Sequence, residues 1–252
     1  MQVTIRLNGK IYQTDLRRGF DLSIPLVSNA SRPKCFYAPD FRVEPVVSGD
    51  FTGEVSQGSS VNFRNIMINP HGNGTHTECA GHITAENITI NQTLKQHHFT
   101  ARLVSVNAIK TENEDLVITS GALISAVDGS DITEAIIIRT LPNGPDKKTM
   151  DYSGTNPPYF EADAIEWLSN AGIDHLITDL PSVDREIDGG KLAAHKAFWG
   201  WPDLKNRQRT ITEMAYASPE IPDGLYLCNI QTAPVETDAS PSRIVIFPLS
   251  EI

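Results

Sequence analysis

Residues 69–83 read NPHGNGTHTECAGHI, and they place three of the seven histidines of the chain close to one acid, Glu78. The histidines are His71, His76 and His82. A stretch of this kind can serve as a metal site, as a catalytic loop, or as a polar turn whose histidines only make hydrogen bonds. The spacing of the side chains is the first evidence that separates these three interpretations.

The spacing favours a metal site. If residues 75–79 are extended, His76 and Glu78 point to the same side, because side chains two residues apart share one face of a strand. Glycines at positions 72, 74 and 81 allow the backbone to bend on either side. Neutral imidazole and carboxylate groups together bind Zn²⁺ or another first-row ion such as Mn²⁺ or Fe²⁺. Three such ligands with one open position indicate a catalytic rather than a structural ion.

The composition excludes several other classes of protein. The chain has 252 residues, 40% of them hydrophobic, which is enough to bury a substantial core. A net charge of −10 argues against nucleic acid and against an anionic membrane as partners. No apolar run approaches the ~18 residues of a membrane span, and the N-terminal residues alternate like a strand instead of forming a signal peptide.

Cysteine usage predicts a reducing environment. The three cysteines, Cys35, Cys79 and Cys228, are odd in number and far apart in the sequence, so a disulfide framework is not expected. Disulfide-free chains of this size are typical of the cytoplasm, which we therefore expect as the location of the protein.

The hydrophobic pattern predicts more strands than helices. The predicted strands cover residues 61–68, 101–108, 115–118, 134–140, 173–180, 225–230 and 243–247. The predicted helices cover residues 120–127, 160–171 and 190–199, and the second has acids in its first turn and Gly172 at its end. The alternation of strands and helices predicts a single mixed α/β domain over residues 1–252. Residues 28–58, rich in proline and glycine, are predicted to form a long lid or binding segment.

The run from His71 to His82 resembles the metal-binding signature of the cyclase family, which includes bacterial kynurenine formamidase and isatin hydrolase. That signature is His-x-Gly-Thr-His-x-Asp-x-Pro-x-His, and Gly74-Thr75-His76, the acid at position 78 and His82 stand in register with it. Four further segments resemble the family in the same order: DLSIPL (21–26), LPSVDREIDGGKLAAH (180–195), RTITE (209–213) and the closing stretch 224–249 with its Asp-Ala-x-Pro-x-Arg segment. The resemblance implies a fold of the kynurenine-formamidase type, with a swivelling β/β/α-like core.

The resemblance also implies a role for individual residues. The ligands of a first metal ion correspond to His71, His76 and Glu78. In two-metal members the same acid holds a second ion together with residues that correspond to His195 and Glu213. The proton donor and acceptor corresponds to His82, and an aromatic substrate contact to Phe36 or Tyr37. We therefore expect one or two divalent ions per chain, with zinc as the first choice and manganese as the alternative.

Three departures from the signature affect this site. The first two histidines are five residues apart instead of four, so a bulge at Gly72 or Gly74 must absorb the extra residue. Glu78 replaces an aspartate, and its extra methylene moves the carboxylate by roughly 1.5 Å. Cys79-Ala80-Gly81 stands where the family has x-Pro-x, and we expect Cys79 to be a buried thiol that points away from the metal.

Together these features predict a metal-dependent hydrolase that cleaves an amide-type C–N bond of a small molecule and resembles arylformamidase, which converts N-formylkynurenine to kynurenine and formate. The ion activates water and polarises the carbonyl, while His82 moves the proton. The alternatives are a hydrolase of cyclic amides such as isatin and a metal-binding protein without catalysis. A serine mechanism is disfavoured because no Gly-x-Ser-x-Gly motif occurs. Family members are commonly dimers or tetramers, so we expect a homodimer or homotetramer.

Overall fold

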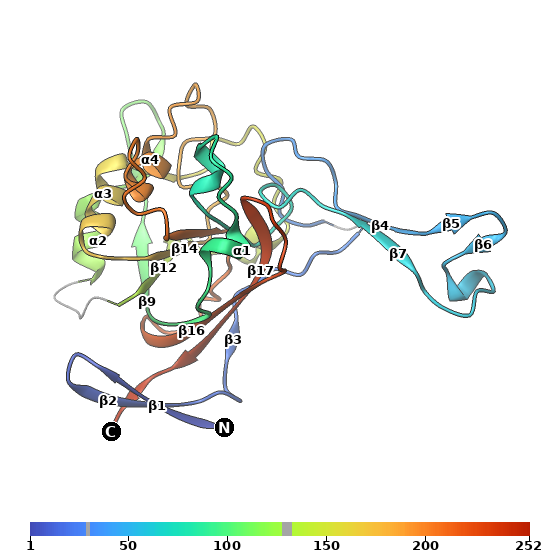
Figure 1. Ribbon diagram of the computed structural model, residues 1–252. Coiled ribbons are helices and arrows are strands. Elements are labelled where there is room, and N and C mark those ends of the chain that lie inside the picture. Colours follow the sequence, from blue (N-terminus) through green and yellow to red (C-terminus); the bar gives the residue numbers. More distant parts are fainter. Residues whose placement is uncertain (29–30, 128–132) are drawn as a thin grey trace.

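The computed structural model describes residues 1–28, 31–127 and 133–252, and its centre is a closed β-barrel (Figure 1). Within these residues seven strands follow one another around the barrel: β16 (Gly224–Thr232), β9 (His98–Asn107), β12 (Ala135–Leu141), β14 (His175–Thr178), β15 (Thr210–Glu213), β8 (His76–Glu78) and β17 (Ala239–Pro248). The barrel closes because β17 pairs back onto β16. Strand β3 (Phe20–Asp21) extends the sheet beside β17.

Strand β12 shows how the hydrophobic pattern builds two cores. Its sequence AIIIRTL is rich in β-branched residues, and nearly all of it is buried, as expected for a parallel strand that is covered on both faces. Ile136 and Ile138 belong to the core shared with the helices, whereas Ala135 and Ile137 belong to the core inside the barrel. This alternation follows from the two-residue period of a strand, and it makes each barrel strand a wall between two apolar layers.

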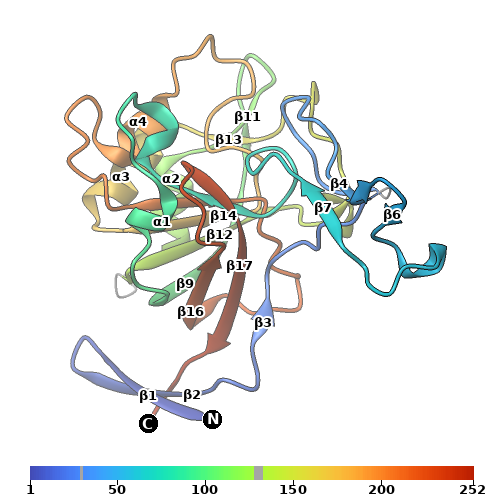
Figure 2. The same cartoon turned by 45° about the vertical axis from the view of Figure 1, so that its right-hand side comes forward.

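Three helices cover the outer face of the parallel strands (Figure 2). They are α2 (Ser120–Val127), α3 (Ala162–Asn170) and α4 (Ala193–Trp199). Helix α3 buries Ala164, Ile165 and Leu168 and ends shortly before Gly172, whose φ of +87° suits glycine. A one-turn helix, α1 (Ile90–Thr93), and three 3₁₀ turns, Val55–Gln57, Ala80–Ile83 and Pro145–Lys148, lie in the connections.

Smaller sheets lie at the periphery. The chain ends meet in a three-stranded sheet formed by β1 (Gln2–Leu7), β2 (Lys10–Asp15) and β18 (Ser250–Glu251). A second three-stranded sheet contains β10 (Ile109–Lys110), β11 (Leu116–Ile118) and β13 (Tyr159–Phe160). An arm of two ribbons projects from the body: β4 (Arg42–Pro45) pairs with β7 (Arg64–Met67), and β5 (Val47–Ser48) pairs with β6 (Phe51–Thr52) (Figure 1).

The structure confirms the predicted mixed α/β fold and corrects several boundaries. The predicted strand 61–68 forms only over residues 64–67, and it pairs with β4 in the exposed arm instead of entering the main sheet. The reason is that its apolar residues have no buried partner surface, and all four residues of β7 are exposed. The predicted lid, residues 28–58, contains part of this arm, and its residues 29 and 30 lie outside the described ranges. No helix of the described residues is long and apolar enough to cross a membrane.

Candidate metal centre

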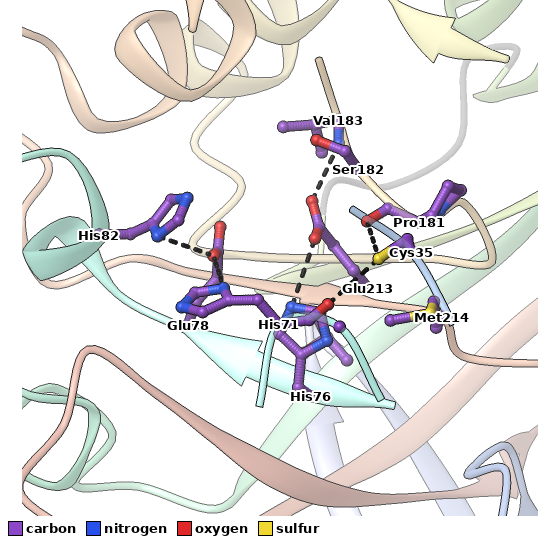
Figure 3. Close-up of polar contacts among 12 residues, drawn as sticks. Cys35, His71, His76, Glu78, His82, Pro181, Ser182, Val183, Glu213 and Met214 are labelled. Atoms are coloured by element: carbon purple, nitrogen blue, oxygen red, sulfur yellow. Dashed lines mark hydrogen bonds and ion pairs between the residues drawn. The ribbon is translucent and has the colours of Figure 1, made fainter. Parts of the chain in front are cut away.

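The candidate site is built on the neighbouring strands β8 and β15. Their antiparallel register places Glu213 opposite His76 and Ile211 opposite Glu78. Because β8 is extended, His76 and Glu78 project to the same face, while Thr77 projects to the other face and meets Thr212, with 2.8 Å between the two hydroxyl oxygens. Glu213 thus reaches a histidine far from it in the sequence, with 3.3 Å between Glu213 Oε2 and His76 Nε2 (Figure 3).

The turn before β8 brings His71 into the same group despite the extra residue. Asn69 and Asn73 close this turn, since the Asn73 side chain accepts a hydrogen bond from the Asn69 amide at 2.8 Å. Gly74 then adopts a φ of +143°, a value that L side chains rarely adopt, and so absorbs the insertion. The result is a distance of 3.1 Å between His71 Nδ1 and Glu78 Oε2.

Helix α4 supplies His195 from the other side of the site. His195 Nε2 lies 3.1 Å from Glu78 Oε1 and 3.9 Å from Glu213 Oε1. Its Nδ1 lies 2.6 Å from Asp184 Oδ2, and the Asp184 carboxylate also accepts the backbone amides of Ala194 and His195. Asp184 therefore caps the start of the helix and fixes the imidazole, leaving Nε2 to face the site, as carboxylates behind metal-ligating histidines do.

We expect Asp184→Asn to lower the affinity for a divalent ion about 10- to 100-fold, the usual effect of losing such a supporting carboxylate. Titration calorimetry or competition with a chelator of known affinity measures this change. Asp188→Asn is the matched control, because Asp188 lies on the same loop but accepts only the amides of Gly190 and Leu192. Equal affinities in the two variants would contradict a supporting role for Asp184.

His82 lies at the open side of the group. The 3₁₀ turn Ala80–Ile83 returns the chain toward the site, so that His82 Nδ1 is 3.9 Å from Glu78 Oε2 and 3.3 Å from Asp238 Oδ2. Gly81 is required in this turn, because a Cβ there would lie 2.0 Å from the Ile88 carbonyl oxygen. Cys79 points into the barrel core and its Sγ contacts the Ile88 carbonyl at 3.5 Å, which confirms the predicted buried thiol that points away.

The donor atoms fit a divalent ion. Among the described residues, three overlapping groups have ligand atoms within 4.8 Å of one another: His71–His76–Glu78, Glu78–His82–His195 and His71–His82–Asp238. Two atoms of the first group, His76 Nε2 and Glu78 Oε2, are buried without a hydrogen-bond partner among those residues. Tetrahedral ligands around zinc lie roughly 3.4 Å apart, close to the observed spacing. Two buried acceptors without donors are what an ion between them would satisfy.

The carboxylates of the site need positive charge next to them. Burial raises the pKa of the Glu78 carboxyl, but the imidazoles of His82 and His195 outweigh burial and hold that pKa well below its usual range. For His195, burial lowers the pKa, yet the nearby Glu78 and Asp184 raise it to about 10. Burial likewise lowers the pKa of His71, and the nearby carboxylates of Asp238 and Glu78 reverse this and raise it to about 10. The positive charge beside the carboxylates is therefore supplied either by protonated histidines or by a metal ion that takes the place of those protons.

Glu213 lies beside histidines of the candidate metal site, whereas only one of the two predicted aromatic substrate contacts, Phe36, lines the cavity. Glu213 Oε1 accepts the Val183 amide at 2.9 Å, so this acid lies beside His76 and His195 but belongs to none of the three compact groups. Phe36 lines the cavity above the histidines, whereas Tyr37 does not line it, is 76% exposed, and donates its amide to Ser153 Oγ. The Cys35 thiol lies behind His71, 3.3 Å from the His71 carbonyl oxygen (Figure 3).

The cavity beside the group has a volume of about 240 Å³. Its wall contains His71, His82, His195 and Glu213, and residues 182–192 form the opposite side with Ser182 and Leu192. A larger hollow of about 350 Å³ lies on the other side of the same loop, but none of the histidines line it. The smaller cavity is therefore the one that combines the histidines with an aromatic side chain, Phe36.

Two residues of the site were not assigned by sequence reasoning. For Asp184, beside Pro181, the sequence left two roles open, a turn residue, which was favoured, or a carboxylate that orients a metal ligand; Asp238 received no role although it begins the Asp-Ala-x-Pro-x-Arg segment. The only signal in the sequence was that this segment resembles the family. Asp238 lies next to His71 and His82 because β17 pairs with β8, and the pattern of neighbouring residues in the sequence does not reveal that pairing.

Comparison with known proteins identifies the family of the chain. The sequence model of the family described as "Putative cyclase" matches residues 20–185, about two thirds of the chain, and the chain belongs to this family. The match includes the motif on β8 and ends before His195 and Glu213. A search of curated proteins finds no match.

Solved structures share the fold. A protein from Bacillus stearothermophilus described as a predicted metal-dependent hydrolase is 18% identical, with a TM-score of 0.61 over 91% of this chain and 98% of that chain. Isatin hydrolase A from Labrenzia aggregata, bound to benzyl benzoate, is 17% identical, with a TM-score of 0.63 over 91% and 93%. Isatin hydrolase A from Ralstonia solanacearum is 16% identical, with a TM-score of 0.62 over 91% of each chain. At these identities the likeness concerns the fold.

Proposed function

We propose that the protein is a metal-dependent hydrolase that cleaves an amide-type C–N bond in a small molecule. The observation that carries this proposal is a pair of buried acceptors, His76 Nε2 and Glu78 Oε2, that have no donor among the described residues. They lie next to a partly exposed imidazole, His82, that lines a cavity. A purely structural metal site would not need the open side or the accessible histidine.

The metal ligands divide into two sets that share Glu78. His71 and His76, which form a compact group with Glu78, complete the first set. His195 and Glu213 complete the second set, since His195 Nε2 lies 3.1 Å from Glu78 Oε1 and 3.9 Å from Glu213 Oε1; Glu213 Oε2 also lies 3.3 Å from His76 Nε2 of the first set. One or two ions bind there, with zinc as the first choice and manganese as the alternative. A bound divalent ion supplies Lewis acidity, which polarises a carbonyl oxygen and brings the pKa of a water ligand toward 7.

His82 is the group that moves the proton. Its side chain is 29% exposed, so it can reach both water and a bound substrate from the rim of the metal site. Its Nδ1 faces Asp238, and no hydrogen bond occupies its Nε2 among the described residues. An imidazole takes a proton from water and returns it to a leaving nitrogen near neutral pH, because its ordinary pKa is about 6.5.

The cavity supports an aromatic amide as substrate. Phe36 forms part of its wall, and an aromatic side chain stacks well against a flat ring. A volume of about 240 Å³ suits a small molecule and excludes a folded polypeptide. Arylformamides, of which N-formylkynurenine is one, and cyclic aryl amides such as isatin both meet these conditions, and the first class is the one that the sequence predicts.

A substrate panel tests the proposal. The protein is purified, its metal content is measured, and hydrolysis of N-aryl formamides and cyclic aryl amides is followed with Zn²⁺ and with Mn²⁺. We expect at least ~1 ion per chain, higher thermal stability with the ion than with a chelator, and turnover of at least one class. A metal-loaded protein that hydrolyses neither class would instead be a metal-binding protein without catalysis, and a protein that neither contains nor takes up an ion would overturn the metal site.

The expected homodimer or homotetramer stays a prediction, as do the cytoplasmic location and the absence of nucleic-acid and membrane partners. Exposed apolar side chains on the arm, among them Phe63, Ile66 and Met67, support self-association, because a two-stranded ribbon is marginally stable alone. Sedimentation velocity of the purified protein measures its oligomeric state, and a monomer at all concentrations would contradict the prediction.

A further inference from the structure

A single carboxylate oxygen touches two histidines of the site. Asp238 Oδ2 lies 2.9 Å from His71 Nε2 and 3.3 Å from His82 Nδ1. The backbone holds Asp238 in place: its carbonyl accepts the Cys79 amide at 3.0 Å, and the residue lies directly before β17, which pairs with β8. The acid that joins the two histidines is therefore anchored to the same strand that carries His76 and Glu78.

We infer that Asp238 is a positioning residue that sets the tautomers of both His71 and His82. An ionised carboxylate can only accept hydrogen bonds, so each ring nitrogen that faces it carries a proton. In the neutral imidazole the other ring nitrogen then keeps its lone pair. Asp238 consequently directs the lone pair of His71 to Nδ1 and the lone pair of His82 to Nε2.

The first consequence concerns metal binding by His71. Its Nδ1 lies 3.1 Å from Glu78 Oε2, and both atoms are acceptors when Asp238 fixes the proton on Nε2. The other two histidine ligands follow the same rule: His76 donates Nδ1–H to the Gly74 carbonyl at 2.9 Å, and His195 donates Nδ1–H to Asp184. Each of the three thus has an acceptor behind it and one lone pair that faces the carboxylates, which is the arrangement that a divalent ion requires.

The second consequence concerns the role of His82. His82 is near enough to Glu78 and His195 to complete a group of metal ligands with them, and the ring nitrogen that lies 3.9 Å from Glu78 Oε2 is Nδ1. A proton fixed on Nδ1 by Asp238 removes that lone pair and leaves Nε2 for proton transfer. On the proposed hydrolytic function, on which this step rests, Asp238 therefore keeps His82 as the acid and base and prevents it from becoming a metal ligand.

The test compares Asp238→Ala, Asp238→Asn and Glu236→Gln with the wild type. Glu236 is the matched control, because it lies two residues away but its carboxylate accepts hydrogen bonds from the side chains of Thr89, Asn91 and Gln92 instead of contacting the histidines. Two quantities are measured: the affinity and stoichiometry of Zn²⁺ by titration calorimetry, which needs no substrate, and kcat and KM at saturating metal for an amide that the wild type hydrolyses.

For Asp238→Ala we expect a 10- to 100-fold lower Zn²⁺ affinity at unchanged stoichiometry, and a kcat that falls roughly 10-fold or more while KM changes little. Asp238→Asn should recover part of the affinity, because its amide oxygen still accepts a hydrogen bond, and Glu236→Gln should match the wild type. Wild-type affinity in both Asp238 variants would overturn the inference, and so would the loss of one whole ion per chain, which would make Asp238 a ligand. A wild-type protein without activity would contradict the proposed hydrolytic function. The Zn²⁺ affinities of the variants would still show whether Asp238 positions His71.

Discussion

A His76→Ala variant is expected to lose the divalent ion and all measurable hydrolysis. His76 is fully buried, its Nδ1 is fixed by the Gly74 carbonyl, and its Nε2 faces Glu213 at 3.3 Å without a hydrogen bond. The neighbouring imidazoles contact Glu78 instead, with His71 Nδ1 3.1 Å from Oε2 and His195 Nε2 3.1 Å from Oε1. The truncation therefore removes a ligand and leaves buried carboxylates that the ion would otherwise neutralise.

Metal analysis and thermal unfolding with and without Zn²⁺ check this expectation. An ion present at ~1,000 times its Kd raises the free energy of unfolding by about 4 kcal/mol, a gain that the variant should lack. The control is His175→Ala, which removes another buried imidazole, one that packs against Phe99 and contacts Thr210 but has no carboxylate partner in hydrogen-bond contact. A His76→Ala protein that keeps one ion per chain and is stabilised by it would contradict the ligand assignment.

A His82→Ala variant is expected to keep its metal and to lose most of its activity. The His82 ring lies at the rim of the site, partly exposed, and its Nδ1 is 3.9 Å from the nearest oxygen of Glu78, further than the Nδ1 of His71. Removing a general acid and base lowers kcat about 10²- to 10⁴-fold, whereas ligands on β8, β15 and α4 remain in place.

Metal stoichiometry and steady-state kinetics separate the two effects. The opening of the cavity next to His82 leaves room for imidazole added to the solution, so chemical rescue of kcat in the alanine variant is a further expected result. Loss of an ion together with activity would show that His82 is a metal ligand, as its distance to Glu78 and His195 would permit. Full activity without His82 would remove it from the mechanism.

The local parts of this protein could be predicted from its sequence. The two-residue spacing of His76 and Glu78 placed both side chains on one face of a strand, and β8 is extended there. Helix α2 matches its prediction, and α3 has the predicted apolar face with boundaries shifted by one or two residues. These features depend on the period of neighbouring residues and on caps, which are contained in a short window of sequence.

Other local predictions failed where distant residues decide the conformation. The third helix begins at Ala193 instead of residue 190, because Leu192 adopts a φ of +48° and Asp184, eight residues before Leu192, caps the helix. The strand predicted over residues 61–68 is shorter and lies in the arm, since it pairs there with β4, whose residues alternate between exposed and half-buried. A hydrophobic pattern alone does not show which surface will cover it.

The sequence by itself determined the chemistry: which imidazoles and carboxylates are present, that His76 and Glu78 converge, and which family the chain resembles. The tertiary structure decided how the distant parts meet. The register of β15 against β8 places Glu213 opposite His76, helix α4 brings His195, and the pairing of β17 with β8 brings Asp238 to His71 and His82. The physical reason is that the pairings of β8 with β15 and with β17 join residues more than a hundred positions apart, for which local periodicity holds no information.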